Sequence, residues 1–206
     1  MDGRGIIWSQ FILAAALART ARAVLDRAPA AADAEVVFAY ADTHGGSGRI
    51  ERPAALDEVL ARRRDFAMPR FHEATSHGAT SHGAMTAAAG HPGSWVLAGR
   101  VIAGLGLTDP GMARLAFEAD VNDLAPEVIA AAQGNREVGW TRFWSHDWFQ
   151  FLRNRIAMAN RPHFVFIDPP ADDPRGPGYA IDAAILLDTL GIPYMVSYPV
   201  ESPQEP

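Results

Sequence analysis

The sequence contains no cysteine and no lysine among its 206 residues. The absence of cysteine excludes disulfide bonds, thiolate metal sites and cysteine nucleophiles. Long apolar runs are absent too. The best candidate, Ile6–Leu17, is interrupted by Ser9 and Gln10, and it is shorter than the ~18 to 20 residues that a membrane span needs. We interpret it as a core helix, because a basic start and a cleavage site typical of signal peptides are missing. A cytoplasmic location and no membrane partner are therefore the default expectations.

Acidic residues outnumber basic ones, and the formal net charge is −6. This balance argues against broad, non-specific binding of nucleic acid, which depends on neutralising phosphates. A local basic face is still compatible with it. The densest basic run is Arg62, Arg63 and Arg64. We favour a solvated helix end for this run over a phosphate contact, because cations suit the carboxyl end of a helix.

Apolar runs of strand length alternate with helical segments along the chain. The expected strands are Glu35–Ala41, Met112–Glu118, Val138–Trp144, Phe164–Ile167 and Pro193–Tyr198. The expected helices are Ile6–Arg27, Pro53–Arg64, Ser94–Ala103, Asp120–Gln133, Asp147–Ala159 and Tyr179–Leu190. Continuous apolar strands are typical of parallel sheets buried on both faces. The alternation predicts a Rossmann-like α/β fold with five mainly parallel strands and helices on both faces.

The segment 50–92 is expected to be a helical and irregular insertion after the first strand, within one domain that spans 1–206. It contains a tandem repeat, in which residues 74–78 and 79–83 both read Ala-Thr-Ser-His-Gly. Two copies of five residues are too few for a solenoid, so we interpret the repeat as a flexible loop. The tail 201–206 is expected to be disordered.

Acidic residues stand at four expected strand ends. Asp42 follows the first strand, Glu118 ends the second, Asp147 follows the third and Asp168 follows the fourth. Ligands of parallel sheets bind beyond the carboxyl ends of the strands. Each carboxylate taken alone is better explained as a helix cap or a solvated loop residue than as a ligand-binding group. The four together predict a site for a nucleoside cofactor.

Two short motifs support that site. The first is the turn Gly46-Ser47-Gly48, because glycine lets the backbone approach a ligand closely and adopt positive φ. The second is Asp168-Pro169-Pro170, in which two prolines fix the backbone directly after an apolar strand. The glycine turn is a weak signal by itself, since such turns are common.

These motifs resemble those of the bacterial 23S ribosomal RNA adenine-N6 methyltransferases of the RlmJ type, in divergent and shortened form. The resemblance spans about Val36 to Val200 in one continuous order. It rests on the following segments: Asp42-Thr43-His44-Gly45-Gly46-Ser47-Gly48-Arg49, Pro92-Gly93-Ser94-Trp95, Glu118, Asp147-Trp148-Phe149-Gln150, Ile167-Asp168-Pro169-Pro170 and Tyr198-Pro199-Val200. The first and the Asp-Pro-Pro segments are specific together, and the others are weak individually.

The resemblance implies a class I methyltransferase fold with strand order 3-2-1-4-5, the cofactor S-adenosyl-L-methionine, and ribosomal RNA as substrate. It implies a catalytic role for Asp168, Pro169 and Pro170. It also implies cofactor contacts from a second group of residues: Asp42, His44, Gly46, Gly48, Ser94, Glu118, Asp147 and Trp148. In this chemistry the Asp168 carboxylate and the Pro169 carbonyl accept the two hydrogens of the adenine amine, and no metal is required.

The sequence also departs from that family. Ala171 replaces the tyrosine that follows the two prolines in the family, where an aromatic ring normally stacks on the target base. Trp148 and Tyr179 are alternative stacking partners, or ordinary packing. The family's amino-terminal stretch rich in His and Asn is missing, and the sequence stops after the fifth strand. That strand is then an exposed edge, which a second copy of the chain could cover.

Three other functions remain open. The departures favour a non-catalytic module that binds the cofactor or RNA. A metal site would use His72, His77, His82 and His91, but their spacing fits no short zinc pattern and no cysteine assists. A dehydrogenase is disfavoured, because Glu51 stands where Gly-x-Gly-x-x-Gly requires its third glycine.

Overall fold

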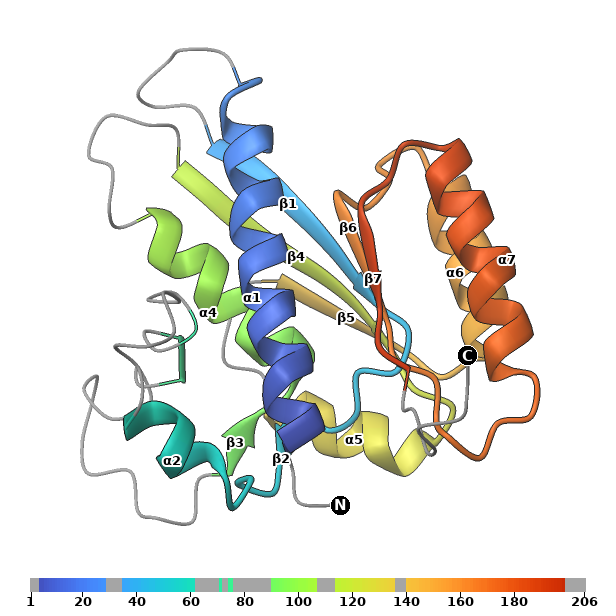
Figure 1. The fold of residues 1–206 in the computed structure, drawn as a ribbon. Coiled ribbons are helices and arrows are strands. Elements are labelled where there is room, and N and C mark those ends of the chain that lie inside the picture. The colour runs from blue at the N-terminus through green and yellow to red at the C-terminus, as the bar shows by residue number, and fades with distance from the viewer. Residues whose placement is uncertain are drawn as a thin grey trace.

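The computed structural model describes residues 4–28, 35–61, 71, 74–75, 90–106, 114–135 and 140–198. Its helices are α1 (Arg4–Leu25), α2 (Leu56–Ala61), α4 (Ser94–Gly106), α5 (Pro126–Gly134), α6 (Trp148–Ala157) and α7 (Gly176–Thr189). Its strands are β1 (Glu35–Asp42), β2 (Arg49–Ile50), β3 (His91–Pro92), β4 (Arg114–Asn122), β5 (Trp140–Trp144), β6 (Phe164–Ile167) and β7 (Tyr194–Val196). Figure 1 shows their arrangement.

Five strands form one parallel sheet in the order β5-β4-β1-β6-β7. Counted in chain order without the short β2 and β3, this is the order 3-2-1-4-5. The central strand β1 pairs with β4 on one side and with β6 on the other. The expected α/β class is therefore confirmed, and the direction of winding reverses between β1 and β6.

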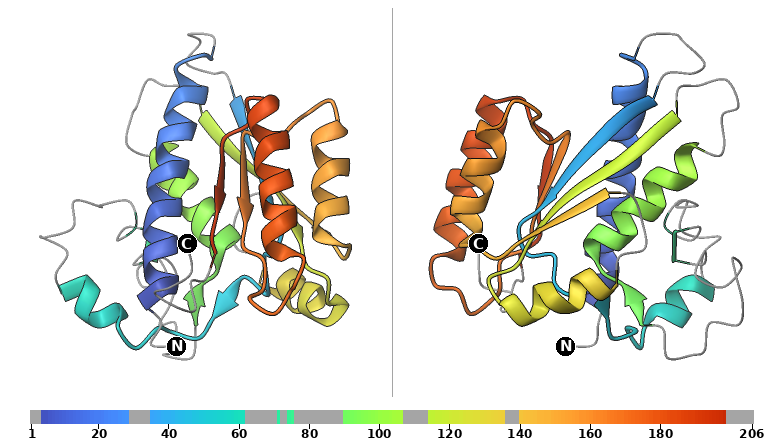
Figure 2. Two further views of the ribbon diagram at one scale, coloured as in Figure 1. Left: turned by 45° about the vertical axis from the view of Figure 1, so that its right-hand side comes forward. Right: turned by 180° about the vertical axis from the view of Figure 1, so that it is seen from behind.

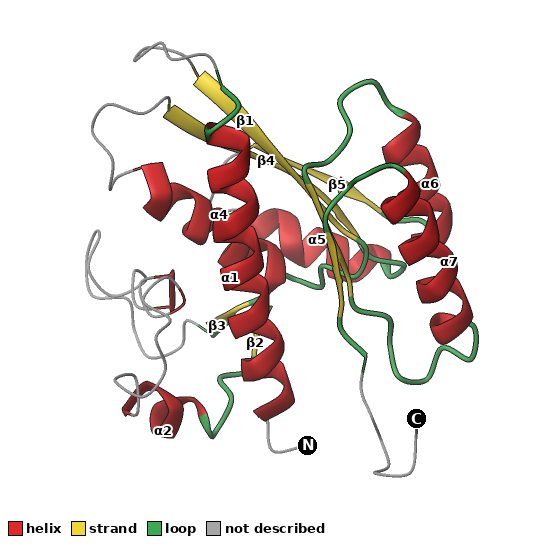
Figure 3. Ribbon diagram, turned by 45° about the horizontal axis from the view of Figure 1, so that its top comes forward, coloured by secondary structure: helices red, strands yellow, loops and turns green. Residues whose placement is uncertain are grey.

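Helices cover both faces of this sheet (Figures 1 and 3). On one face, α1 and α4 pack with β1 and β4 around a core that includes Phe11, Leu17 and Trp95. On the other face, α6 and α7 pack against Ala41 of β1 and Val165 of β6. Because β1 is covered on both sides, its second half is fully buried. This burial is why its sequence reads as a continuous apolar run rather than an alternating one.

A second sheet of two antiparallel strands, β2 and β3, was not expected from the sequence. It pairs Arg49 with Pro92 and Ile50 with His91, and so joins the two ends of the insertion. Gln10 of α1 anchors this two-stranded sheet, the β2–β3 ribbon, through two hydrogen bonds to β3. Its Nε2 donates to the Pro92 carbonyl at 2.9 Å, and its Oε1 lies 2.6 Å from His91 Nε2.

Most of the predicted insertion lies outside the described residues, including Arg62–Arg64, His72, His77 and His82. The same holds for most of the repeat 74–83 and for the tail 201–206. The single domain over 1–206 with an insertion over 50–92 therefore stays a prediction. Phe71, one of the few described residues there, is buried and stacks on Phe11 with ring centroids 4.1 Å apart.

The main sheet has two open edges among the described residues, β5 and β7. Figure 2 shows β7 in its left view between α1 and α7, with no described strand on its outer side. That a second copy covers this edge stays a prediction. Within the described part of the chain, no helix has the length and apolarity to cross a membrane.

Candidate functional site

A cavity of about 430 Å³ lies at the carboxyl ends of β1 and β6. Its walls come from α1, the turn after β1, the start of α4, the loop after β6 and the residues after β7. Six of the predicted site residues line it: His44, Gly46, Ser94, Asp168, Pro169 and Pro170. The cavity therefore sits where the winding of the sheet reverses, which is the usual ligand position in open α/β sheets. Its volume is within the ~300 to 1,000 Å³ typical of small-molecule sites.

The turn after β1 depends on its glycines. Gly46 and Gly48 adopt φ values of 57° and 78°, a region that side chains other than glycine rarely enter. Gly48 does not line the cavity. A Cβ there would lie 2.2 Å from the ring of Trp95, so glycine is needed to let the turn close over the first residues of α4. Gly48 thus shapes the wall, and Gly46 forms part of it.

Asp42 lies directly behind this wall and is completely buried. Its Oδ2 accepts hydrogen bonds from the Tyr40 hydroxyl at 2.9 Å and from the Ser94 hydroxyl at 2.5 Å. Its Oδ1 accepts from the His44 N–H at 3.2 Å. The carboxylate therefore ties the glycine turn to the start of α4. Burial raises the pKa of Asp42 from its ordinary value of 3.8 to about 7, although the three hydrogen bonds oppose the shift.

The raised pKa of Asp42 predicts a pH-dependent stability. The folded state holds this proton more tightly than the unfolded chain, so the stabilisation is complete below pH 3.8 and is lost as the pH rises through about 7. The loss is on the order of 4 kcal/mol. The Asp42→Asn variant cannot titrate, so the difference in unfolding free energy between wild type and variant is expected to change over that range. Urea unfolding of both proteins from pH 4 to 8 measures it.

His44 changes stability in the opposite direction, which is why a variant is needed as the reference. Burial lowers the pKa of His44 from 6.5 to about 4. The stability it contributes is therefore lost as the pH falls through about 4. Parallel stability curves for wild type and Asp42→Asn would show that the pKa of Asp42 is the same in the folded and the unfolded state, and would contradict the raised pKa.

Asp168 lines the cavity from the loop that follows β6. Partial removal from water raises the pKa of its carboxyl, and a hydrogen bond with Ser197 opposes this rise. Pro169 is buried beside it, while Pro170 is exposed. The strand end was predicted correctly, because the two prolines cannot continue a strand in the centre of a sheet.

Glu118 is placed wrongly by the sequence prediction. β4 continues for four residues beyond it, and Glu118 pairs in mid-strand with Ala39 and Trp140. The strand continues because the charge of Asp120, the next acidic residue, is neutralised inside the fold. Asp120 is 1% exposed and binds the guanidinium groups of Arg142 and Arg155. The true tip of β4 is an amide, not a carboxylate.

That tip residue, Asn122, is buried and fully hydrogen-bonded. Its Nδ2 donates to the carbonyls of Thr43 and His146 at 3.1 and 3.0 Å, and its Oδ1 accepts from the His146 N–H at 3.1 Å. It therefore links the tips of β1, β4 and β5. Neither Glu118 nor Asn122 is among the residues that line the cavity, and Asp168 is the acidic residue of that lining.

Asp147 and Trp148 also lie outside the cavity lining. Asp147 is the N-cap of α6, and its Oδ1 accepts from the N–H groups of Phe149 and Gln150 at 3.1 and 3.0 Å. Trp148 is 5% exposed and packs against His44 and Tyr179, with ring centroids 5.3 and 6.1 Å away. Helix capping, the simpler of the two explanations, accounts for Asp147. Of the four carboxylates expected to converge, Asp168 lines the cavity and Asp42 is buried behind its wall, whereas Glu118 and Asp147 are not in the lining.

Two further walls were not predicted. α1 contributes one through Gly5, Ile6, Ser9, Gln10 and Leu13, and the segment after β7 contributes Ser197 and Tyr198. Ser9 and Gln10, the polar residues that interrupt the apolar run of α1, were the available signal for the first. Tyr198 keeps 49% of its surface exposed. It is the aromatic side chain of the cavity lining that reaches solvent, whereas Trp148 and Tyr179 do not line the cavity.

The metal hypothesis gains no support from the described residues, which contain no group of three potential ligands. His91 is buried, and its Nε2 is engaged by Gln10. Burial lowers the pKa of His91 to about 4. A neutral, hydrogen-bonded histidine in the ribbon accounts for this residue.

Comparisons with known proteins show the fold. No protein-family model matches the sequence, and no curated protein matches it. Among solved structures, the chain is similar to protein LPL1258 from Legionella pneumophila str. Philadelphia 1, which is described by the family model DUF519. The TM-score is 0.60 at 15% sequence identity, and the match covers 93% of this chain and 68% of that chain.

Proposed function

We propose that the protein is an S-adenosyl-L-methionine-dependent methyltransferase that modifies the N6 amine of adenine in RNA, most specifically ribosomal RNA. The observation that carries the proposal is one of placement. Asp168, Pro169 and the glycine turn open onto one cavity at the switch point of a five-stranded parallel sheet. The resemblance to RlmJ-type enzymes supports the choice of cofactor and substrate.

The residues present fit the amino-acid end of such a cofactor. The first helical hydrogen bond of α4 runs from the Leu97 N–H to the Gly93 carbonyl, so the earlier N–H groups of the helix have no helical acceptor. Gly93 and Ser94 line the cavity at this point. The amino end of a helix favours a carboxylate, and Gly46 permits close approach of the backbone.

The nucleoside end of the cofactor would be held differently from the family pattern. Since Glu118 and Asp147 do not line the cavity, recognition of the ribose and the base would depend on backbone groups of the glycine turn and on His44. Burial keeps His44 neutral at physiological pH. The neutral ring can then pack against the nucleoside of the cofactor. It adds no second positive charge near the sulfonium of the same molecule.

The proposed chemistry uses Asp168 to position the target amine. The adenine amine is a poor nucleophile, because its lone pair is delocalised into the ring. The Asp168 carboxylate and the Pro169 carbonyl each accept a hydrogen bond from one N–H group of the amine. These two bonds favour a pyramidal nitrogen whose lone pair is free to react. When bound, the cofactor would supply the electrophilic methyl group and leave as its demethylated product, and the Asp168 carboxylate would accept the proton that the methylated amine loses. Positioning and hydrogen bonding account for the rate.

Tyr198 is proposed as the stacking partner of the target base. Ala171 lines the cavity at the position where a tyrosine would follow the two prolines, and Tyr198 lines the same cavity. A base held between these walls would bring its amine toward Asp168. This assignment replaces Trp148 and Tyr179, whose rings pack on α6 and α7.

The second candidate is a module that binds the cofactor or RNA without turnover. Ala171 and the positions of Glu118 and Asp147 favour it. Isothermal titration of the protein with S-adenosyl-L-methionine and with its demethylated product tests the shared premise, and we expect a single saturable site. Absence of heat at millimolar ligand contradicts the methyltransferase and the cofactor-binding module, and leaves a module that binds RNA alone. Binding without transfer of label to unmodified ribosomal RNA favours the module.

A further inference from the structure

A second cavity, of about 520 Å³, lies at the amino ends of β6 and β7, at the opposite end of the sheet from Asp168. The carboxyl half of α1 forms one wall, and the segments that lead into β6 and β7 form the other. Ala16 and Ala23 of α1 line the cavity, and their small side chains leave it open. The two cavities share no lining residue, so this second site is independent of the proposed function. Its volume is also typical of small-molecule sites.

Two arginines of α1 line this second cavity. Arg19 and Arg27 stand eight residues apart with Ala23 midway, so all three lie on one face of the helix. Neither guanidinium has an ion pair or a hydrogen bond with a described residue. No carboxylate lines the cavity, because Asp26 after α1 and Asp188 of α7 are exposed and lie outside the lining. The positive charge of the lining is therefore not balanced by its own residues.

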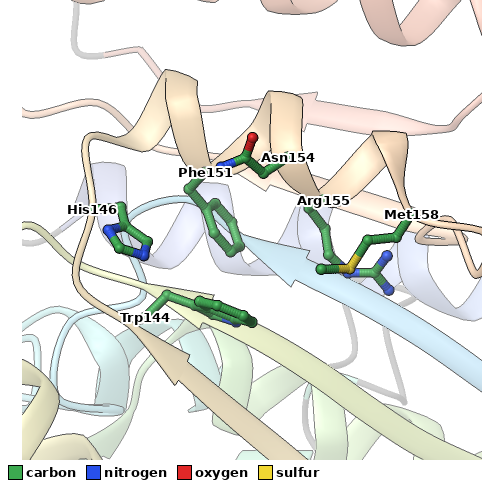
Figure 4. A pocket seen from close by; sticks show the side chains of 6 residues that line it. All are labelled: Trp144, His146, Phe151, Asn154, Arg155 and Met158. Carbon is green, nitrogen blue, oxygen red and sulfur yellow. The ribbon is translucent and has the colours of Figure 1, made fainter.

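Arginines on the other side of the molecule serve the fold instead. Figure 4 shows Arg155 among the six side chains around a small pocket of about 40 Å³ between β5 and α6. Its Nε donates to Asp120 at 2.5 Å, and Arg142 binds the same carboxylate. These guanidinium groups are balanced and held inside the structure. Arg19 and Arg27 have no such partner among the described residues and are free to bind a ligand.

The wall that faces α1 adds a histidine in a defined tautomer. The Ala39 N–H donates to His163 Nδ1 at 3.0 Å, so the proton of the neutral ring is on Nε2. Removal from water lowers the pKa of His163, and the charge of Arg155 lowers it further, so the ring is neutral at physiological pH. No described residue accepts a hydrogen bond from Nε2. His163 therefore contributes a donor, and not an acceptor, to the lining.

The edge strand β7 adds a backbone donor. The Val165 N–H of β6 donates to the Pro193 carbonyl at 3.0 Å, and Val165 pairs with Tyr194. Successive residues of a strand direct their backbone groups to opposite sides, so the Tyr194 N–H points away from β6. No described strand pairs with the outer side of β7. Tyr194 lines the cavity, and its N–H has no acceptor among the described residues.

We propose that this second cavity binds a small organic anion, in which an apolar body carries a carboxylate or a phosphate group. Arg19 and Arg27 supply the positive charge, because guanidinium groups bind both kinds of anion. The His163 ring and the Tyr194 N–H supply neutral donors. Such a ligand accepts from donors that the fold leaves without acceptors. Its body packs against the apolar side chains of the lining, which include Val24, Phe164, Ile192 and Pro193.

The fluorescent probe 1-anilinonaphthalene-8-sulfonate is an aromatic anion whose emission rises in an apolar site. Titration of the native protein with this probe, without cofactor, is expected to show one saturable site whose affinity falls as salt is added. The double variant Arg19→Gln/Arg27→Gln is expected to bind the probe roughly tenfold more weakly. Ala23→Phe fills the cavity from an exposed helix position and is expected to abolish the saturable site. Circular dichroism shows whether each variant keeps the native fold.

Arg22→Gln/Arg153→Gln is the matched control, because it removes the same charge from two exposed arginines that do not line the cavity. Its affinity for the probe is expected to stay within about twofold of wild type. Equal weakening in the two double variants would mean that the probe responds to net charge alone, and would overturn the proposal. Absence of saturable binding by the native protein would overturn it too, as would native affinity in a folded Ala23→Phe variant.

Displacement of the probe identifies the class of ligand. Octanoate and phenyl phosphate are expected to displace it from the native protein, and the tighter of the two assigns the site to a carboxylate or to a phosphate ester. Octanol is expected to leave the probe bound. If octanol displaces it as well as octanoate does, the ligand need not be an anion and the proposal is wrong. Inorganic phosphate that competes as well as phenyl phosphate contradicts the role of the apolar body.

Discussion

Asp168→Asn is expected to lower the rate of methyl transfer by about 10²- to 10³-fold. The amide keeps the size of the side chain but offers one acceptor and one donor in place of two acceptors, so its donor end faces the hydrogens of the target amine. Affinity for the cofactor is expected to stay within about threefold, because the change removes a contact to the substrate. Transfer of labelled methyl groups to unmodified ribosomal RNA, combined with calorimetry, measures both quantities.

Asp172→Asn is the matched control for this experiment. Asp172 lies in the same loop after β6, is exposed, and does not line the cavity. We expect its transfer rate to equal that of wild type. If Asp168→Asn also retains full activity, Asp168 does not position the amine and the proposed chemistry is wrong. If both variants lose activity equally, the loop rather than the carboxylate is responsible.

Gly48→Ala is expected to destabilise the folded state by roughly 2 to 5 kcal/mol. Two effects combine in this range. The backbone at Gly48 is left-handed, with φ of 78°, and the added Cβ would lie 2.2 Å from the Trp95 ring. Trp95 is fully buried in the main core and cannot move aside cheaply. Urea unfolding followed by tryptophan fluorescence and circular dichroism measures the loss.

Gly46→Ala separates the two effects. Gly46 has φ of 57° but no neighbouring atom within 4 Å of an added Cβ, so backbone strain of roughly 1 kcal/mol is expected alone. In α4, Gly104 has similar space and no positive φ, so Gly104→Ala is expected to stabilise by roughly 0.5 to 1 kcal/mol. Equal losses for Gly48→Ala and Gly46→Ala contradict the steric role assigned to Trp95.

The strands were predictable where local chemistry alone decides their limits. Pro169 and Pro170 end β6, because proline lacks the N–H that a sheet requires. β4 could not be limited in this way. Asp120 looks like the start of a loop, but two arginines 22 and 35 residues further along the chain neutralise it in the fold. Such long-range pairing has no signature in a single sequence.

The candidate site was predicted only where local sequence decides the position of a residue, as for the strands. His44, Gly46, Ser94 and Asp168 follow strand ends or open a helix, and local patterns place them correctly. Asp147 also follows a strand, but whether a carboxylate there caps the next helix or faces a ligand depends on its rotamer and on neighbouring loops. The contribution of α1 depends on how that helix crosses the sheet, which its own periodicity does not specify.

The β2–β3 ribbon has a consequence for how this protein can vary. It pairs the residues on either side of the stretch 51–90. The Gly93 N–H donates to the Gly48 carbonyl of the glycine turn, and Gln10 binds Pro92 and His91 of β3. The closure entropy of a loop rises only slowly with its length. The length of the connecting stretch can therefore change at little cost, whereas Leu56, Phe71 and Ala74 within it belong to the main core and have to be kept or replaced by other apolar side chains.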